Sequence, residues 1–421
     1  MPAPHRIVLL LRLLGATIAG CSAVLTPYVI AKLYTGRGGD TPVRSALNEQ
    51  PLLALLGTIC VAVGCFLLLR PRVVYDARDC LNPKWVLKNR SREFALLMVV
   101  TFVCLGLLEF ASRYIYAAQR GFPITYSLEE LVYPPLHEQF RDYTDEGAHV
   151  LLIGGSVLYF AGLDGRIESA FDPPAHVYNL AQTAHSSLDA RTKLEWALEH
   201  GYRFDYVIFY EAINDVRANN VPPDRFDLEY NHYFFYRRVN TVFSGRKPWL
   251  RALLHSSLFY RAYELASDLG STRMFGRGLL HLAFPREDWL RFGGEIKSAE
   301  SYRLNLTSIA DLCEQHGAKL IVPHYIYDPR LDQWANGKLA WTDDQANRYT
   351  EQWGLAENVR KGIQAHNRVI EELSGRFHFV DTSPLERPGN FVDPCHLTPE
   401  ANQQLIDILI GALRDATVSG P

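Results

Sequence analysis

The chain has 421 residues, of which 48% are hydrophobic and 21% are charged, and its formal net charge is -3. This balance, with no basic patch in the polar part of the chain, argues against a nucleic-acid-binding protein. The length would suit two or three compact domains if all of it were soluble.

Three apolar stretches in the N-terminal part are too long for ordinary core helices. They cover about residues 7–31, 52–70 and 94–112, and each is close to the roughly 20 residues that a helix needs to cross a bilayer. We therefore predict a membrane anchor of three transmembrane helices over residues 1–117, followed by one soluble domain over residues 118–421.

Basic residues predict the orientation of this anchor. The connection after the second stretch, residues 70–93, carries seven Lys and Arg residues, whereas the connection after the first carries three. The positive-inside rule places the richer connection in the cytoplasm. The N-terminus is then cytoplasmic, and the C-terminal domain lies on the periplasmic or other extracytoplasmic side of a multi-pass inner-membrane protein. Glu109 and Arg113, four residues apart at the exit of the third helix, are expected to pair.

The N-terminus has one alternative interpretation. Residues 18–21 resemble a bacterial lipobox, in which Cys21 would be lipidated after cleavage of a signal peptide. The chain stays apolar through Ile30 and Arg12 interrupts the apolar run, so we favour a transmembrane helix.

Cysteines give little evidence of a disulfide framework or a metal site. Of seven cysteines, only Cys313 and Cys395 lie in the predicted extracytoplasmic domain, and we expect both to be free thiols. No Cys/His cluster has zinc spacing. The sequence predicts neither a metal nor a cofactor.

Strands and helices alternate in the polar part of the chain. Predicted strands cover residues 150–153, 176–180, 206–210, 319–322 and 377–380, and predicted helices cover residues 188–200, 298–316, 357–373 and 399–413. This alternation predicts an α/β fold with a parallel sheet covered by helices on both faces. An aromatic-rich insertion at about residues 216–297 interrupts it, either as a lid over the active-site edge or as a separate helical subdomain.

Polar residues suited to catalysis lie at three places: after the first and third predicted strands, and before the last predicted helix. The first strand ends at Gly154 and Gly155, which allow the chain to turn sharply and present Ser156 at the carboxyl edge of the sheet, where open α/β sheets place their sites. Asn214 follows the third strand and can aim its amide at a developing oxyanion, although such residues also form ordinary turns. Asp393 precedes His396 by three residues in a proline-containing loop, so its carboxylate can hold the imidazole in one tautomer.

These residues resemble the SGNH hydrolases, also called GDSL-type esterases, from about residue 148 to the C-terminus. The four blocks of that family are matched in order by residues 154–156, 179–181, 212–215 and 393–396. The resemblance implies a three-layer, flavodoxin-like α/β/α domain with Ser156 as nucleophile, His396 as base and Asp393 as its orienter. It also implies an oxyanion hole formed by the backbone N–H groups of Ser156 and Ala181 and the side chain of Asn214.

The sequence departs from the family at three glycine or aspartate positions. Gly155 stands where better-known members carry aspartate, and Ala181 and Ala212 stand where glycine is usual. The added methyl groups raise the question of whether these loops reach the same backbone angles. Asn179 and Tyr325 are candidate substrate-binding residues, with a structural role in the loop as the alternative for Tyr325.

We therefore expect a membrane-anchored serine esterase or acyl hydrolase that acts through an acyl-serine intermediate on an acylated small molecule, lipid or glycan. One alternative is an O-acyltransferase that modifies a cell-surface polysaccharide, with a membrane acyl-donor partner. A second is a catalytically silent binding or assembly module that keeps the fold, because fold does not imply function.

Overall fold

The computed structural model describes residues 135–224, 226, 228, 287–339 and 353–418, together with 105–106, 108–114, 117, 125–127, 129–130 and 133. The first two predicted transmembrane stretches, most of the third and most of the 216–297 insertion lie outside these residues. Within the described residues, no helix combines the length and the apolar character that a membrane span requires.

The chain divides into two compact units, and residues 105–117 belong to the first while the described residues from 125 onward belong to the second. In the first unit, Arg113 Nε donates to Glu109 Oε1 at 2.7 Å. This confirms the predicted i,i+4 pair.

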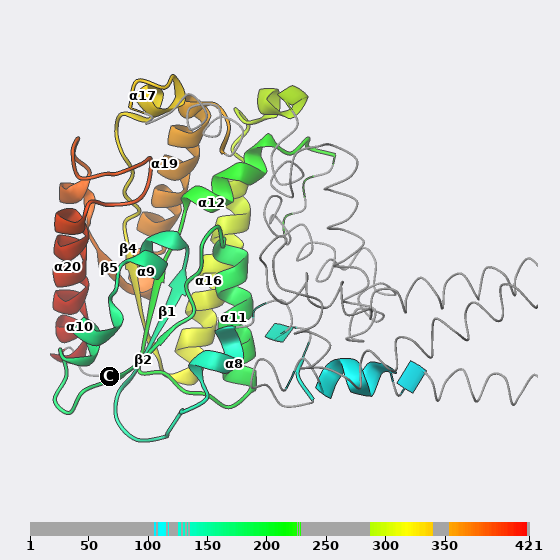
Figure 1. Cartoon of the computed structure of the whole chain (residues 1–421). Coiled ribbons are helices and arrows are strands. Elements are labelled where there is room, and N and C mark those ends of the chain that lie inside the picture. Colours follow the sequence, from blue (N-terminus) through cyan, green and yellow to red (C-terminus); the bar gives the residue numbers. More distant parts are fainter. Residues whose placement is uncertain are drawn as a thin grey trace, which may run out of the picture. The chain divides into compact units, whose positions relative to one another are not determined.

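The second unit is built on one five-stranded parallel sheet with the order β2-β1-β3-β4-β5 (Figure 1). The strands are β1 (His149–Gly154), β2 (His176–Asn179), β3 (Tyr206–Tyr210), β4 (Lys319–Pro323) and β5 (His378–Val380). All five predicted strands are present within two residues of their predicted bounds. The order 2-1-3-4-5 is that of flavodoxin-like, doubly wound folds, so the predicted architecture is confirmed for this unit.

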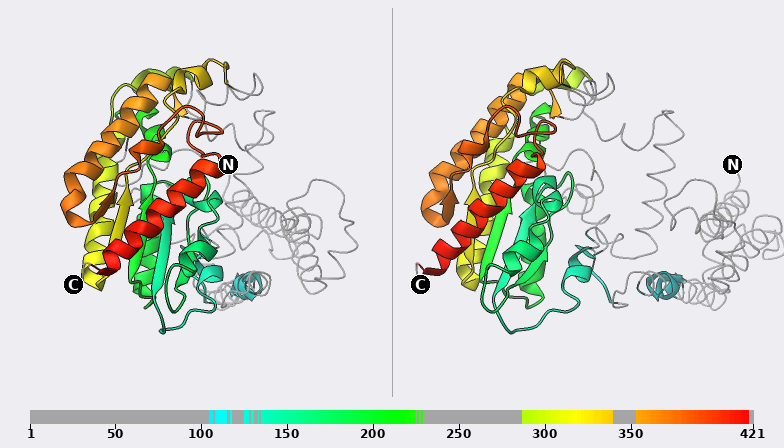
Figure 2. Two further views of the ribbon diagram at one scale, coloured as in Figure 1. Left: turned by 90° about the vertical axis from the view of Figure 1, so that its left-hand side faces the viewer. Right: turned by 60° about the vertical axis from the view of Figure 1, so that its left-hand side comes forward.

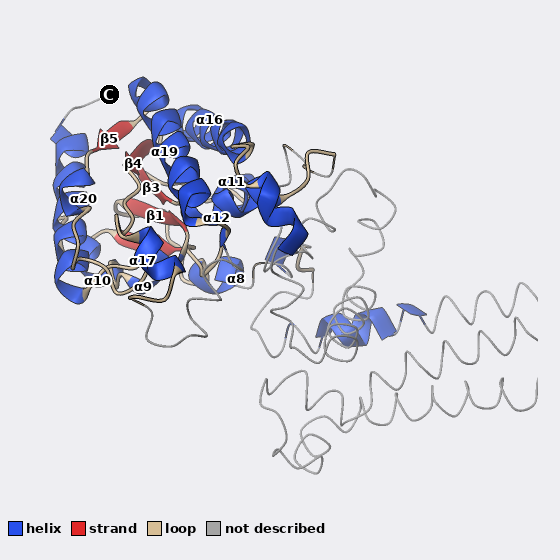
Figure 3. Ribbon diagram, turned by 90° about the horizontal axis from the view of Figure 1, so that it is seen from above, coloured by secondary structure: helices blue, strands red, loops and turns tan. Residues whose placement is uncertain are grey.

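Helices cover both faces of the sheet, which Figure 3 shows from above. One face carries α11 (Ser187–Glu199), α16 (Ser298–His316) and α19 (Ala356–Leu373), and the other carries α10 (Asp164–Glu168) and α20 (Pro399–Val418). Figure 2 shows α20 lying along its face of the sheet, with α16 and α19 on the far side. The shorter helices are α8 (Pro135–Gln139), α9 (Ser156–Phe160), α12 (Ile213–Val216), α17 (Leu331–Ala335), η2 (Arg217–Asn220), η4 (Glu287–Phe292), η5 (Ser374–Arg376) and η6 (Ser383–Leu385).

The sequence pattern accounts for these layers. Every residue of β1 and β3 is buried, as expected for the central strands of a sheet covered on both faces. In α19, Val359, Ile363, His366 and Ile370 recur at helical spacing on the buried face. Helix α16 ends at His316 and is followed by Gly317, whose φ of 72° is the left-handed conformation common after a helix.

Candidate active site

The turn that presents Ser156 requires glycine at position 154. Gly154 has φ +151°, and a Cβ on it would lie 2.2 Å from the carbonyl oxygen of Tyr210 on the neighbouring strand β3. Gly155 N then donates to the same oxygen at 3.3 Å, and α9 begins at Ser156. As the first residue of a helix, Ser156 has a backbone N–H outside the intrahelical hydrogen-bond ladder.

His396 bridges Asp393 and Ser156, and Ser156 lies 240 residues before His396 in the sequence. His396 Nε2 lies 2.6 Å from Ser156 Oγ, and His396 Nδ1 lies 2.5 Å from Asp393 Oδ2. A carboxylate can only accept, so Nδ1 carries the proton and Nε2 accepts the hydrogen bond from the serine hydroxyl. The three residues assigned to catalysis from the sequence are therefore brought together in one hydrogen-bonded chain.

The loop around Asp393 fixes its carboxylate. Oδ1 accepts the backbone N–H groups of Cys395 at 2.9 Å and His396 at 2.7 Å, while Oδ2 is left for the imidazole. Burial by itself would raise the pKa of Asp393, but the hydrogen bonds from His396 and from these N–H groups outweigh it, and the pKa is lowered. Asp393 therefore remains ionised beside the imidazole.

The surroundings of His396 raise the pKa of its imidazole. Its pKa is raised by the Cys395 sulfur, 3.7 Å from Nδ1, and by the Asp393 carboxylate, against the opposing effect of burial. Burial raises the pKa of the Cys395 thiol, so this thiol is neutral near pH 7 and Asp393 is then the group that stabilises an imidazolium. Cys313 and Cys395 are both free thiols, as predicted.

Among the described residues, one group of side chains has the spacing of a metal site. The ligand atoms of Asp393, Cys395 and His396 all lie within 4.8 Å of one another. However, Nδ1 of His396 and Oδ2 of Asp393 already bond to each other, and a metal needs the thiolate form of cysteine, which burial disfavours here. The arrangement fits a serine-histidine-aspartate triad better than a metal centre.

Asn214 lies on α12, directly after β3. Its Nδ2 donates to His185 O, in the loop before α11, at 3.0 Å and to Glu211 Oε2, directly after β3, at 3.1 Å. The neighbouring Asp215 accepts from Ser187 N and Ser187 Oγ at 2.9 and 2.5 Å, which ties α12 to the start of α11. Ala212 has a negative φ, -161°, so this position does not need the left-handed backbone that favours glycine.

The second block differs from the sequence-based expectation. Ala181 N–H donates to Asn179 Oδ1 at 3.0 Å, and Asn179 Nδ2 donates to Asp164 Oδ1 at 3.2 Å. The Ala181 N–H is therefore engaged within the loop, and the Asn179 side chain ties the loop to α10. Ala184, in the same loop, has a left-handed backbone with φ 62°. Glycine would adopt this conformation more readily than alanine.

A buried lysine behind this loop was missed by the sequence analysis. Lys193 Nζ on α11 donates to Leu180 O at 2.5 Å and lies 2.5 Å from His185 Nδ1. Burial lowers its pKa to about 7. Lys193 thus holds the loop that carries Ala184 and the carbonyl that binds Asn214. A lysine on the apolar face of the predicted helix 188–200 was the only sequence signal for it.

Tyr325 lies beneath the site and is 1% exposed. Its ring stacks on Tyr210 with centroids 5.0 Å apart, and Asn367 holds both its backbone N–H and its backbone carbonyl. The hydroxyl is buried, with no hydrogen-bond partner in the part of the chain that the structure describes. The surface beside the triad is instead formed by Tyr159 and Phe160, which are 51% and 63% exposed; the Phe160 ring lies edge-on to His396 at 5.7 Å.

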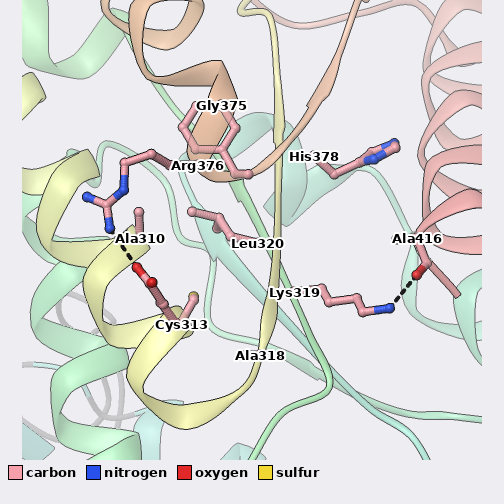
Figure 4. A pocket seen from close by; sticks show the side chains of 11 residues that line it. Ala310, Cys313, Ala318, Lys319, Leu320, Gly375, Arg376, His378 and Ala416 are labelled. Atoms are coloured by element: carbon pink, nitrogen blue, oxygen red, sulfur yellow. Dashed lines mark hydrogen bonds and ion pairs between the residues drawn. The ribbon is translucent and has the colours of Figure 1, made fainter. Parts of the chain in front are cut away.

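A cavity of about 580 Å³ lies at the opposite edge of the sheet, at the amino ends of β4 and β5 (Figure 4). Lys319 on its wall donates to the Ala416 carbonyl, and Arg376 pairs with Glu314. Because the triad lies at the carboxyl ends of the strands, this cavity does not serve it.

No family model and no curated protein matches this sequence. Solved structures with a similar fold include a GDSL-like lipase from Bacteroides thetaiotaomicron, with 12% identity over 68% of this chain and 98% of that chain and a TM-score of 0.38. A lipase/acylhydrolase from Enterococcus faecalis has 11% identity, coverage of 64% and 96%, and a TM-score of 0.33. An acetylxylan esterase from Geobacillus stearothermophilus has 12% identity, coverage of 63% and 94%, and a TM-score of 0.32.

The strand order, together with four blocks placed on turns at the carboxyl ends of the strands and in the loop before α20, gives this unit an SGNH/GDSL-hydrolase-like fold. At these identities the likeness to solved structures concerns the fold alone.

Proposed function

We propose that this protein is a membrane-anchored serine esterase or acyl hydrolase that acts through an acyl-serine intermediate. The observation that carries the proposal is the continuous chain from Ser156 Oγ through His396 to Asp393, with hydrogen bonds of 2.6 and 2.5 Å. A serine hydroxyl is a weak nucleophile, and an imidazole held in the correct tautomer is the base that activates it.

The proposed reaction has two balanced halves. Ser156 Oγ attacks the acyl carbon while its proton passes to His396 Nε2; collapse of the tetrahedral intermediate breaks the ester C–O bond, and the imidazolium returns the proton to the departing alcohol. Water then attacks the acyl-serine, gives its proton to His396, and releases the acid as Ser156 is reprotonated. Asp393 stabilises the imidazolium in both halves.

The oxyanion of each tetrahedral intermediate needs fixed hydrogen-bond donors. The Ser156 backbone N–H at the start of α9 and Asn214 Nδ2 are our candidates. One N–H of Asn214 can be shared between its present acceptor and the oxyanion in a three-centre bond. Ala181 was also predicted as a donor, but its N–H would first have to leave Asn179 Oδ1.

Hydrolysis of p-nitrophenyl acetate by the detergent-solubilised full chain tests this function. We expect Ser156-dependent release of nitrophenol and, among the products, free acetate. Transfer of acetyl to an added glycan faster than release of acetate would instead indicate an O-acyltransferase. A folded protein with no Ser156-dependent reaction on any of several acyl esters would contradict both and favour a silent binding module.

The membrane anchor and the extracytoplasmic location rest on the three apolar stretches and on the seven basic residues between positions 70 and 93. We expect the full chain to stay with membranes after alkaline carbonate washing, and its C-terminal domain to be digested when protease is added to spheroplasts. Release by carbonate, or protection of the domain in intact spheroplasts, would contradict this part of the proposal.

A further inference from the structure

A buried carboxylate not assigned from the sequence lies beside the triad. Glu211, the residue after β3, is 2% exposed. Its Oε1 accepts the backbone N–H of Asn214 at 2.7 Å, and its Oε2 accepts Asn214 Nδ2 at 3.1 Å. The carboxylate therefore accepts hydrogen bonds from both the backbone N–H and the side-chain amide of Asn214, which fixes the Asn214 side chain relative to the Asn214 backbone.

The space for this carboxylate exists only because residue 155 is glycine. A Cβ on Gly155 would lie 1.8 Å from Glu211 Oε2 and 3.1 Å from Asn214 Nδ2. Any side chain at position 155 would have to displace Glu211. An aspartate at position 155 of this chain would place its side chain in the space that the Glu211 carboxylate fills.

The backbone that carries Glu211 is also held firmly. Tyr302 Oη donates to Glu211 O at 2.8 Å. His366 Nδ1, 3.1 Å from Ala212 O, must be the donor to that carbonyl, so His366 Nε2 accepts from Ser298 Oγ at 2.8 Å. Burial lowers the pKa of His366 to about 3, so it is neutral and structural. Glu211 thus projects from a rigid peptide onto Asn214.

The position of Glu211 is electrostatically unfavourable. Burial raises its pKa to about 8, and the nearby Asp215 adds to this, whereas the two hydrogen bonds from Asn214 and the Arg217 guanidinium lower it. Burial thus favours the protonated carboxyl, whereas the two N–H donors on its two separate oxygens favour the ionised form. A buried carboxyl group with a perturbed pKa beside a candidate nucleophile is a candidate functional group.

We infer that Glu211 is a positioning residue, which aims Asn214 at the oxyanion. Gly155 makes this possible because it has no side chain, which leaves free the space that the Glu211 carboxylate fills. This inference rests on the proposed function. Glutamine at position 211 would be a poor substitute, because its amide has one acceptor oxygen and would turn an NH₂ toward the second Asn214 donor.

The test measures steady-state hydrolysis of p-nitrophenyl acetate by the full chain. We expect Glu211→Gln to lower kcat at least tenfold, with KM changed less than threefold, because a misaimed donor can cost up to about 100-fold in rate. In the Asn214→Ala background the same substitution should change kcat less than threefold, because Glu211 acts through Asn214. Glu386→Gln is the matched control, because burial raises the pKa of Glu386 as well. The kcat of this variant should stay within twofold of wild type.

A second set of variants moves the carboxyl group from position 211 to position 155, and it tests the inference even if Glu211→Gln folds poorly. Gly155→Asp alone should lose activity because two carboxyl groups would overlap. The double variant Gly155→Asp/Glu211→Ala should be at least tenfold faster than Glu211→Ala. The inference is overturned if Glu211→Gln leaves kcat within twofold of wild type, raises it, or has its full effect without Asn214. Ser156-dependent hydrolysis in wild type separates these outcomes from failure of the proposed function, which would remove that hydrolysis altogether.

Discussion

Ser156→Ala and His396→Ala should each lower kcat for p-nitrophenyl acetate by about 10⁶-fold, and the double variant should lose no more than either single variant. The reason is that the hydroxyl and the imidazole, 2.6 Å apart, act in one step: without the base the hydroxyl is not activated, and without the hydroxyl the base has no proton to accept. Slow residual hydrolysis would come from binding and the oxyanion donors alone.

His378→Ala is a suitable control for these variants. His378 begins β5 and lines the cavity at the opposite edge of the sheet, so its loss should leave kcat unchanged. Losses from Ser156→Ala and His396→Ala that multiply in the double variant would mean that the two residues act independently. That result would contradict the triad.

Asp393→Asn should lower kcat by about 10⁴-fold while the protein stays folded. Asparagine can present its NH₂ to Nδ1, which then accepts; the proton moves to Nε2, and the imidazole can no longer take the proton of Ser156. Unchanged thermal unfolding with the lowered rate would separate this tautomer effect from a loss of structure.

The same variant should change the pH dependence. Activity needs neutral His396, so kcat/KM falls as the pH drops through the pKa of His396. The Asp393 carboxylate contributes to raising this pKa, so the acidic limb of wild type should lie above the ordinary histidine value of about 6.5. In Asp393→Asn the limb should move to lower pH. A limb that stays in place, with a rate within tenfold of wild type, would show that Asp393 does not face the imidazole during catalysis.

The sheet and its long helices could be predicted because their signals are local. Residues 206–210 and 298–316 have the same bounds in the structure as in the prediction, since a fully buried strand and an amphipathic helix closed by Gly317 are each encoded within one segment. Helix α20 is longer than predicted and runs to Val418. Ala416 in its last turn is buried, and the local hydrophobic pattern does not predict this burial.

The triad could be predicted in part for the same reason. Asp393 and His396 are three residues apart, and the strand ending at Gly154 marks Ser156. Glu211 could not be assigned, because its direction depends on the absence of a side chain at Gly155, 56 positions earlier in the sequence. The loop of residues 179–185 shows the same limit. The family resemblance implied Ala181 as a backbone donor, whereas the N–H of Ala181 bonds to Asn179 and the left-handed residue is Ala184.

Covalent labelling of the full chain by a fluorophosphonate probe tests the central claim most directly, because the probe reacts with a serine only when a neighbouring base has activated it. The predicted result is stoichiometric modification of wild type at Ser156, located by peptide mass spectrometry, with no labelling of Ser156→Ala and strongly reduced labelling of His396→Ala. A folded wild type that remains unlabelled, or a label on another serine, would contradict the assignment of Ser156, His396 and Asp393 as a catalytic triad.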